Sequence, residues 1–287
     1  MTFRTDLAME RCAALGESLP DGICRCNYTF GNIFVELIKV TTDKAAGNIG
    51  KPKGKYITVT TPPFESSLEV SEEEIDKIAQ EIRDLLPNSG TILVVGLGND
   101  DITPDAIGPR TAHQIIATRH IGLEAAAQAG LGELRPTAVL VPGVLGQTGV
   151  ESCEIVRALT QAIKPAAVIV IDALAARSVS RLGNTIQISN SGISPGAGVM
   201  NTRKELSQKT LGVPVVSTGI PTVVDAATLV SDILGKELEL DGCHRQMMVT
   251  PRDIDQLIGH ACRTLALAIN RAVQNNLSIE TISYLMS

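Results

Sequence analysis

Five short runs of valine and isoleucine recur between residues 91 and 217, most of them followed by a polar or glycine-containing segment. The runs cover residues 91–95, 137–141, 167–171, 184–188 and 213–217. Apolar and polar residues do not alternate within them, which is typical of strands buried on both faces of a sheet. The pattern predicts an α/β fold of the phosphorylase/hydrolase-like kind, with a mostly parallel sheet flanked by helices.

Helices are expected over residues 109–117, 150–163, 221–234 and 251–273, because each has an apolar stripe and three of them begin at a proline. An earlier helix is expected after the capping box formed by Ser71 and Glu74. Two apolar runs flank Gly31-Asn32 and predict a hairpin over residues 23–40, and residues 56–61 predict a third strand. We therefore expect a small N-terminal β subdomain within residues 7–66 and the main α/β domain over residues 67–287.

The charge balance argues against several classes of partner. The chain has 25 Lys+Arg against 31 Asp+Glu, a formal net charge of −6, with 2% aromatic residues and no tryptophan. Without a dense basic block or stacking aromatics, we expect no direct binding of nucleic acid. The longest apolar segments are about half of the ~20 residues that a membrane-spanning helix needs, so we expect no membrane association. The six cysteines include no C-x-x-C pair, which favours a reduced, cytoplasmic protein.

Polar residues follow three of the predicted strands, in residues 96–105, 142–149 and 172–177. Ligands of open parallel sheets bind at the carboxyl ends of the strands, so Asp105 and Asp172 are expected to converge there. Spacing alone leaves two interpretations open. The two acids could be catalytic, or Asp105 could favour the start of the following helix while Asp172 accepts hydrogen bonds from loop amides.

Other chemistries fit the motifs less well. The Gly96-x-Gly98 segment lacks the third glycine of a dinucleotide loop, because position 101 is an aspartate that would repel a pyrophosphate. A nucleotide-dependent oxidoreductase is kept as an alternative. The four histidines form no metal-binding spacing, no serine has a G-x-S-x-G context, and two carboxylates are a weak ligand set for nickel or zinc. We expect no cofactor and no required metal.

Eight segments, in order along the chain, resemble the germination protease family of spore-forming bacteria. They are residues 4–8, 49–56, 95–109, 141–151, 171–177, 185–198, 219–226 and 248–251. Members of this family are endopeptidases that degrade small acid-soluble spore proteins. The resemblance implies the same activity and substrates here, and it suggests a homotetramer in the cytoplasm of the spore core.

The resemblance implies that Asp105 and Asp172 form the catalytic pair. Two carboxyl groups held close together share a proton, because they cannot both ionise cheaply. The ionised member would take a proton from the attacking water, and the protonated member would bind the scissile carbonyl. The roles stay unassigned, since a coupled pair titrates as a unit.

A glycine-rich segment over residues 190–198 is expected to bind substrate, through the amides of Gly192, Gly196 and Gly198. An ordinary flexible turn is the other interpretation. The sequence departs from the family pattern at Asn190, Ser194 and Met200. The first two departures, Asn190 and Ser194, keep open the alternative of a catalytically silent spore binding protein.

The N-terminal residues Asp6-Leu7-Ala8-Met9-Glu10 have the family's substrate pattern of an acid, an apolar residue, Ala and a further acid. The resemblance implies a zymogen that cleaves its own Asp6–Leu7 bond and releases residues 1–6 as a prosegment. Asp6 could instead open a helix at Leu7. The acid before the cut calls for a basic partner, and Arg177 and Arg203 are the candidates, although either could be a surface ion-pair former.

Overall fold

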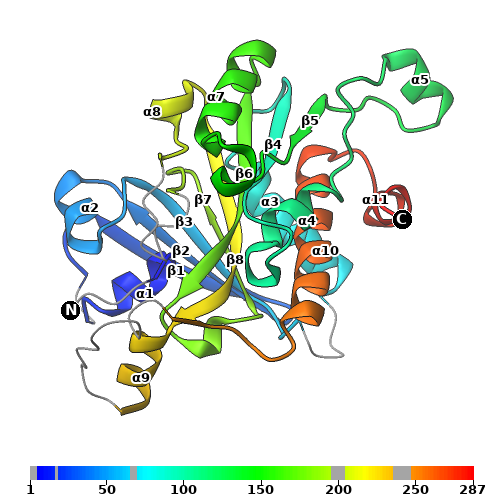
Figure 1. Ribbon diagram of the computed structural model, residues 1–287. Helices are drawn as coiled ribbons and strands as arrows, with labels where there is room; N and C mark the ends of the chain where they lie inside the picture. Colours follow the sequence, from blue (N-terminus) through cyan, green and yellow to red (C-terminus); the bar gives the residue numbers. More distant parts are fainter. Residues whose placement is uncertain (1–4, 17–18, 65–69, 195–203, 235–246) are drawn as a thin grey trace.

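The computed structural model describes residues 5–16, 19–64, 70–194, 204–234 and 247–287. The described chain is built around a 9-stranded mixed sheet with helices on both faces (Figure 1), which confirms the predicted α/β class. The strand order is β1-β2-β3-β7-β8-β6-β4-β5, and β9 pairs with β8. The strands are β1 (Ile23–Phe30), β2 (Ile33–Val40), β3 (Gly54–Thr60), β4 (Ile92–Gly96), β5 (Thr137–Leu140), β6 (Ala167–Ala176), β7 (Thr185–Ser189), β8 (Val215–Asp225) and β9 (Met248–Val249).

Parallel pairing is confined to four neighbouring strands, β5, β4, β6 and β8. β7 lies antiparallel to both of its neighbours, β8 and β3. The chain passes from β6 to β7 through only residues 177–184, which is too short for the crossover that parallel strands need. The parallel part is therefore narrower than the sequence indicates.

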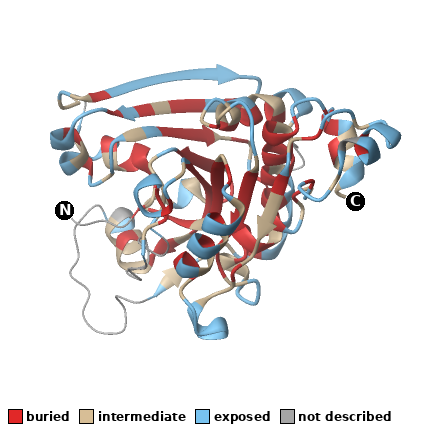
Figure 2. Ribbon diagram, turned by 90° about the horizontal axis from the view of Figure 1, so that it is seen from above, coloured by how far each residue is buried: buried red, intermediate tan, exposed pale blue. Residues whose placement is uncertain are grey.

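The predicted N-terminal strands form β1, β2 and β3, with Gly31 in the left-handed region at φ 56° in the hairpin turn. β3 pairs with β7, so these strands extend the main sheet. β1 is the edge strand, and seven of its eight residues are exposed (Figure 2). The boundary expected between residues 66 and 67 lies outside the described residues.

Helices pack on both faces of the sheet. One face carries α3 (Glu72–Arg83), α4 (Ile107–Ala112), α10 (Ile254–Val273) and α11 (Ile279–Leu285), which share a large aliphatic core with the sheet. The other face carries α1 (Ala8–Ala13) and α2 (Asp43–Ile49) over one aliphatic cluster, and α7 (Ser152–Ile163) and α8 (Gln208–Leu211) beside another. The remaining helices are α5 (Leu123–Gln128), α6 (Leu145–Thr148) and α9 (Ala226–Leu234), with short 3₁₀ turns η1 (Thr103–Asp105) and η2 (Val179–Arg181). The capping box of Ser71 and Glu74 at the start of α3 is confirmed.

None of the described helices is long and apolar enough to span a lipid bilayer.

Two central strands are longer than predicted, so that residues expected in loops or at a helix start lie within the sheet. β6 runs on to Ala176 and β8 runs on to Asp225. The helix expected over residues 221–234 is therefore wrong in its first turn, because α9 begins only at Ala226. Pro221 lies in β8 opposite Leu174, next to a register shift, which is where a strand tolerates a proline. Pairing with β6 outweighs the local helix-start signal.

Candidate active site

The loop after β4 folds back on itself and brings Asp105 over the end of the strand. Leu97 donates its backbone N–H to Ile171 O of β6 at 2.8 Å, and Gly98 follows with φ 117°. A Cβ at Gly98 would lie 2.0 Å from Asp105 O and 3.3 Å from Asp105 Oδ1. Glycine is required here by both the backbone conformation and the close approach of Asp105.

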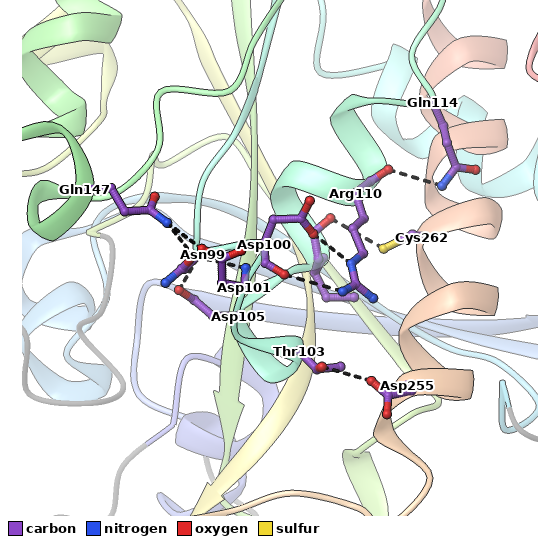
Figure 3. Close-up of polar contacts among 11 residues, drawn as sticks. Asn99, Asp100, Asp101, Thr103, Asp105, Arg110, Gln114, Gln147, Asp255 and Cys262 are labelled. Carbon is purple, nitrogen blue, oxygen red and sulfur yellow. Dashed lines mark hydrogen bonds and ion pairs between the residues drawn. The ribbon is translucent and has the colours of Figure 1, made fainter.

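Asp105 is half-buried, and its carboxylate is bound by the main chain of the same loop. Asn99 donates its backbone N–H to Asp105 Oδ2 at 2.9 Å. The Gln147 amide donates to Asn99 Oδ1 at 3.0 Å and to Asp101 Oδ2 at 2.9 Å (Figure 3). The network around Asn99 therefore fixes the position of Asp105.

The same contacts bear on the dinucleotide alternative. The N–H of Asn99 is bound to Asp105 and the N–H of Asp101 is bound to Asn99 Oδ1 at 3.1 Å. Two loop amides that would face a pyrophosphate are thus already occupied by acceptors of the protein itself.

Three further contacts hold η1 and its loop in place. Thr222 Oγ1 of β8 donates to Pro104 O at 2.6 Å, and Thr103 Oγ1 donates to Asp255 Oδ1 of α10 at 2.9 Å. Arg110 Nε donates to Asp100 Oδ1 at 2.8 Å (Figure 3). Asp105 is thereby anchored to both β8 and the long helix α10.

Asp172 lies within β6 and not after it, which corrects the expectation that it follows the strand. β4 pairs with β6 as far as Gly96 and Ile171, and Asp172 is the next residue. The residue is 6% exposed, and its Oδ1 accepts the Ala173 N–H at 3.1 Å. Asp172 pairs with Gly219 of β8, where a Cβ would lie 2.2 Å from Asp172 O.

The segments that carry the two acids pack against each other. η1, which ends at Asp105, contacts both β6 and β8. Gly108 at the start of α4 packs on the same junction, where a Cβ would lie 2.0 Å from Leu97 O and 2.6 Å from Ile171 O. The segments that carry Asp105 and Asp172 are therefore neighbours at the carboxyl end of β4.

The N-terminal segment binds the part of β6 that extends past β4. Asp6 donates its N–H to Ala175 O at 2.8 Å, and Asp6 Oδ2 accepts the Ala175 N–H at 2.9 Å. The helix-opening alternative for Asp6 is wrong, because α1 begins at Ala8 and its N-cap residue Leu7 makes no side-chain cap. Leu7 itself is fully buried.

Glu10 of α1 makes a second contact with the end of β6. Its carboxylate accepts the N–H of Arg177 at 2.8 Å and the N–H of Ser178 at 2.9 Å. It also accepts the hydroxyl of Thr5. Two acids of the N-terminal segment therefore bind backbone amides of this region, Asp6 at Ala175 of β6 and Glu10 at the two residues just after the strand.

Lys51 is a basic residue near Asp6 that the sequence reasoning did not single out as a ligand of the acid. It follows Gly50, the left-handed C-cap residue of α2. Burial lowers the pKa of the Lys51 ammonium, and the nearby Asp6 carboxylate opposes that effect. The signal available in the sequence was the position of Lys51 within the 49–56 motif.

The other predicted substrate-binding residues are placed only in part. The main-chain N–H of Arg177 binds Glu10. Gly192 has φ 86°, and a Cβ there would lie 2.5 Å from Leu206 O, so close packing accounts for this glycine. Gly196, Gly198 and Arg203 lie outside the described residues. Of the departures from the family pattern, Asn190 Oδ1 accepts the Lys55 N–H at 2.8 Å.

Within the described part of the chain, no cluster of three or more His, Cys, Asp or Glu residues could hold a metal ion.

The family model and the sequence relatives indicate one family. A family model described as germination protease matches residues 9–242. The chain is 39% identical to the germination protease of Clostridium tetani, over 99% of this chain and 100% of that protein. It is 37% identical to that of Clostridium acetobutylicum over 98% of each chain. Among solved structures, a NiFe hydrogenase maturation protease from Thermococcus kodakarensis is 18% identical with a TM-score of 0.39, covering 68% of this chain and 99% of the other.

Proposed function

Because the chain belongs to the germination protease family, whose members include the relatives described above, we propose that it starts the degradation of small acid-soluble spore proteins during germination. A peptidase activity follows from the family. The finer proposal is that Asp105 and Asp172 carry the reaction and that the chain is made as a zymogen. The observation that supports the catalytic pair is the packing of η1, which ends at Asp105, against the strand that contains Asp172.

In the proposed reaction, the ionised aspartate takes a proton from water as the water oxygen attacks the scissile carbonyl carbon. The protonated aspartate donates a hydrogen bond to the carbonyl oxygen as negative charge develops there. The C–N bond then breaks, and the amine leaves with a proton from the pair. Asp105 and Asp172 share one proton at the start of each cycle, because two adjacent carboxylates would repel each other.

Self-cleavage is proposed at the Asp6–Leu7 bond, with residues 1–6 as the released prosegment. The support is that Asp6 binds Ala175, three positions beyond Asp172 on the same strand. The buried Leu7 side chain holds the uncleaved segment against the sheet. The N-terminal segment is thus docked on the strand that carries one of the proposed catalytic acids.

Recognition of the acid before the cut is proposed to involve positive charge around this position. Lys51 is favoured by its electrostatic interaction with Asp6. Arg177 and Arg203 stay candidates for the same role. The amides of Gly192, Gly196 and Gly198 are proposed to stabilise the oxyanion.

The family resemblance also leads us to propose a homotetramer that acts in the cytoplasm of the spore core.

The function is tested by incubating the purified full-length chain with a small acid-soluble spore protein and identifying the products by mass spectrometry. Cleavage after an acid that precedes an apolar residue and Ala is the expected result. An intact spore protein under conditions where a known germination protease cuts it would contradict the proposal. A catalytically silent binding protein would retain the spore protein without cutting it.

A further inference from the structure

The hydroxyl of Thr5 lies between the backbone nitrogen of Leu7 and the carboxylate of Glu10. Leu7 donates its N–H to Thr5 Oγ1 at 3.0 Å. The same hydroxyl donates to Glu10 Oε2. Thr5 belongs to the proposed prosegment, whereas Leu7 and Glu10 belong to the part of the chain that stays. One hydroxyl group thus separates a future N-terminus from a carboxylate.

The Glu10 carboxylate is buried, with the residue 8% exposed, and it is already committed to the end of β6. Its two oxygens accept the N–H groups of Arg177 and Ser178. These bonds do not involve residues 1–6. Glu10 therefore stays in place as an acceptor after the prosegment leaves.

Hydrolysis of the Asp6–Leu7 bond changes the chemistry at this point. Water adds across the C–N bond, Asp6 leaves with a new α-carboxylate, and Leu7 gains an α-amine that takes up a proton at neutral pH. Release of residues 1–6 removes the Thr5 hydroxyl. The Leu7 ammonium then has no Thr5 acceptor and faces Glu10.

Leu7 stays where it is after the cut because its anchors lie in the retained chain. Leu7 and Ala8 are fully buried in the aliphatic cluster under α1 and α2. The N–H of Ala8 donates to Gln187 Oε1 of β7 at 3.3 Å. Gln187 is itself fixed by donating Nε2 to Ile57 O at 2.9 Å.

The charges near the new Leu7 ammonium also favour its pairing with Glu10. Four charged residues of the retained chain interact with Thr5, Asp6 or Glu10 or belong to that set, namely Glu10 and Arg11 of α1, Lys51 after α2 and Arg177 just after β6, and Asp172 lies three positions before Ala175 on the strand that binds Asp6. The Asp6 carboxylate departs with the prosegment. Among the retained acids, Glu10 is the one that a single hydroxyl, that of Thr5, links to the Leu7 nitrogen.

We propose that Glu10 is a positioning residue, which pairs with the new Leu7 ammonium and so holds the end of β6 in the processed enzyme. The inference rests on the proposed cleavage of the Asp6–Leu7 bond. Release of Asp6 frees the N–H and C=O of Ala175, three positions from Asp172. The pair of Leu7 and Glu10 keeps Arg177 and Ser178, just after β6, in place when Asp6 no longer binds the edge of β6 at Ala175.

The test compares the full chain with the chain that begins at Leu7. The shorter form is obtained by self-cleavage. It is also prepared by removing a fusion partner so that Leu7 is the first residue, and this second preparation does not depend on self-cleavage. Acetic anhydride at pH 8 acylates neutral amines, and mass spectrometry of the N-terminal peptide measures the rate. We expect the Leu7 amine to react at least tenfold more slowly than in the urea-unfolded chain. Equal rates would overturn the inference.

The Glu10→Gln variant separates charge pairing from burial alone. We expect its Leu7 amine to react at least tenfold faster than that of the unaltered processed chain, and its kcat for an acid-containing peptide to fall with little change in KM. The matched control is Glu73→Gln on the exposed side of α3, which should change neither. An amine that stays protected in Glu10→Gln, or an unchanged kcat, would overturn the inference.

If Glu10→Gln does not fold, the pH dependence of acylation in the unaltered processed chain decides. The Leu7 amine is acylated as it loses its proton, so the acylation rate rises with pH through a midpoint. If this midpoint lies at a higher pH than in the unfolded chain, pairing with Glu10 is supported. If it lies at the same or a lower pH, as expected for an amine beside only Arg11 and Lys51, the inference is overturned. Failure of the proposed function gives a different result, in which neither form cuts any peptide although the Leu7 amine is protected.

Discussion

The backbone N–H of Asn99 donates a 2.9 Å hydrogen bond to the Asp105 carboxylate, across a loop that turns back at Gly98. This contact ties the proposed catalytic acid to main-chain atoms, whose position does not depend on a side-chain rotamer. The Asn99 side chain is fixed in turn by Gln147 of α6. The orientation of Asp105 therefore depends on Asn99 and, through it, on Gln147.

Gln147→Ala is expected to lower kcat about 3- to 10-fold with little change in KM, since it removes two hydrogen bonds worth about 1 kcal/mol each. Steady-state cleavage of a spore-protein peptide measures the effect. Gln114→Ala is the matched control, because the Gln114 amide bonds to Arg110 O on α4 and not to this loop. A kcat equal to that of the unaltered enzyme would show that Gln147 does not position Asp105 for catalysis.

Gly98→Ala is expected to destabilise the fold and to abolish activity. The positive φ alone costs about 1–3 kcal/mol for a residue with a side chain. The new Cβ would also lie 2.0 Å from Asp105 O, so the loop has to move. Urea unfolding and peptide cleavage measure the two effects. Gly146→Ala in α6, where a Cβ meets no atom within 4 Å, should be nearly neutral, and equal behaviour of the two variants would count against the close approach.

Lys51→Met is expected to reduce the preference for an acid before the cut. The ratio of kcat/KM for two peptides that differ only by Asp or Asn at that position should fall about tenfold, as expected for loss of a charge-assisted contact. Lys53→Met is the control, because Lys53 pairs with Asp43 at 2.8 Å on the surface. The same ratio in Arg177→Met and Arg203→Met tests the other two candidates. An unchanged ratio in Lys51→Met dismisses Lys51.

Self-cleavage is expected to leave Leu7 as the first residue. N-terminal sequencing after incubation under mildly acidic conditions measures this, and Asp6→Asn should slow the cut because it removes the negative charge beside Lys51. A fully active protein that still begins at Met1 would contradict the zymogen proposal.

The strand runs between residues 91 and 217 were sufficient to predict the class of the fold, because buried strands leave a pattern in local composition. The lengths of β6 and β8 were not predictable in the same way. Residues 172–176 are extended because they pair with residues 219–224, a contact that no local signal records. Pro221 illustrates this, since its helix-start signal is overridden by strand pairing.

Asp105 was predictable as a polar residue that follows a strand, whereas Asp172 was expected after β6 and lies within it. Contacts with backbone atoms were not predictable from the sequence. The docking of Asp6 on Ala175 depends on main-chain atoms of a residue whose side chain carries no chemistry. Lys51 is remote in sequence from both acids and approaches Asp6 only because α1 and α2 share one aliphatic cluster.

The central claim is that Asp105 and Asp172 act together in peptide hydrolysis. The most direct measurement is the cleavage rate of a small acid-soluble spore protein by separate Asp105→Asn and Asp172→Asn variants that retain the unfolding midpoint of the unaltered enzyme. If the two acids act together, each variant loses nearly all cleavage. Full activity in either one would contradict it.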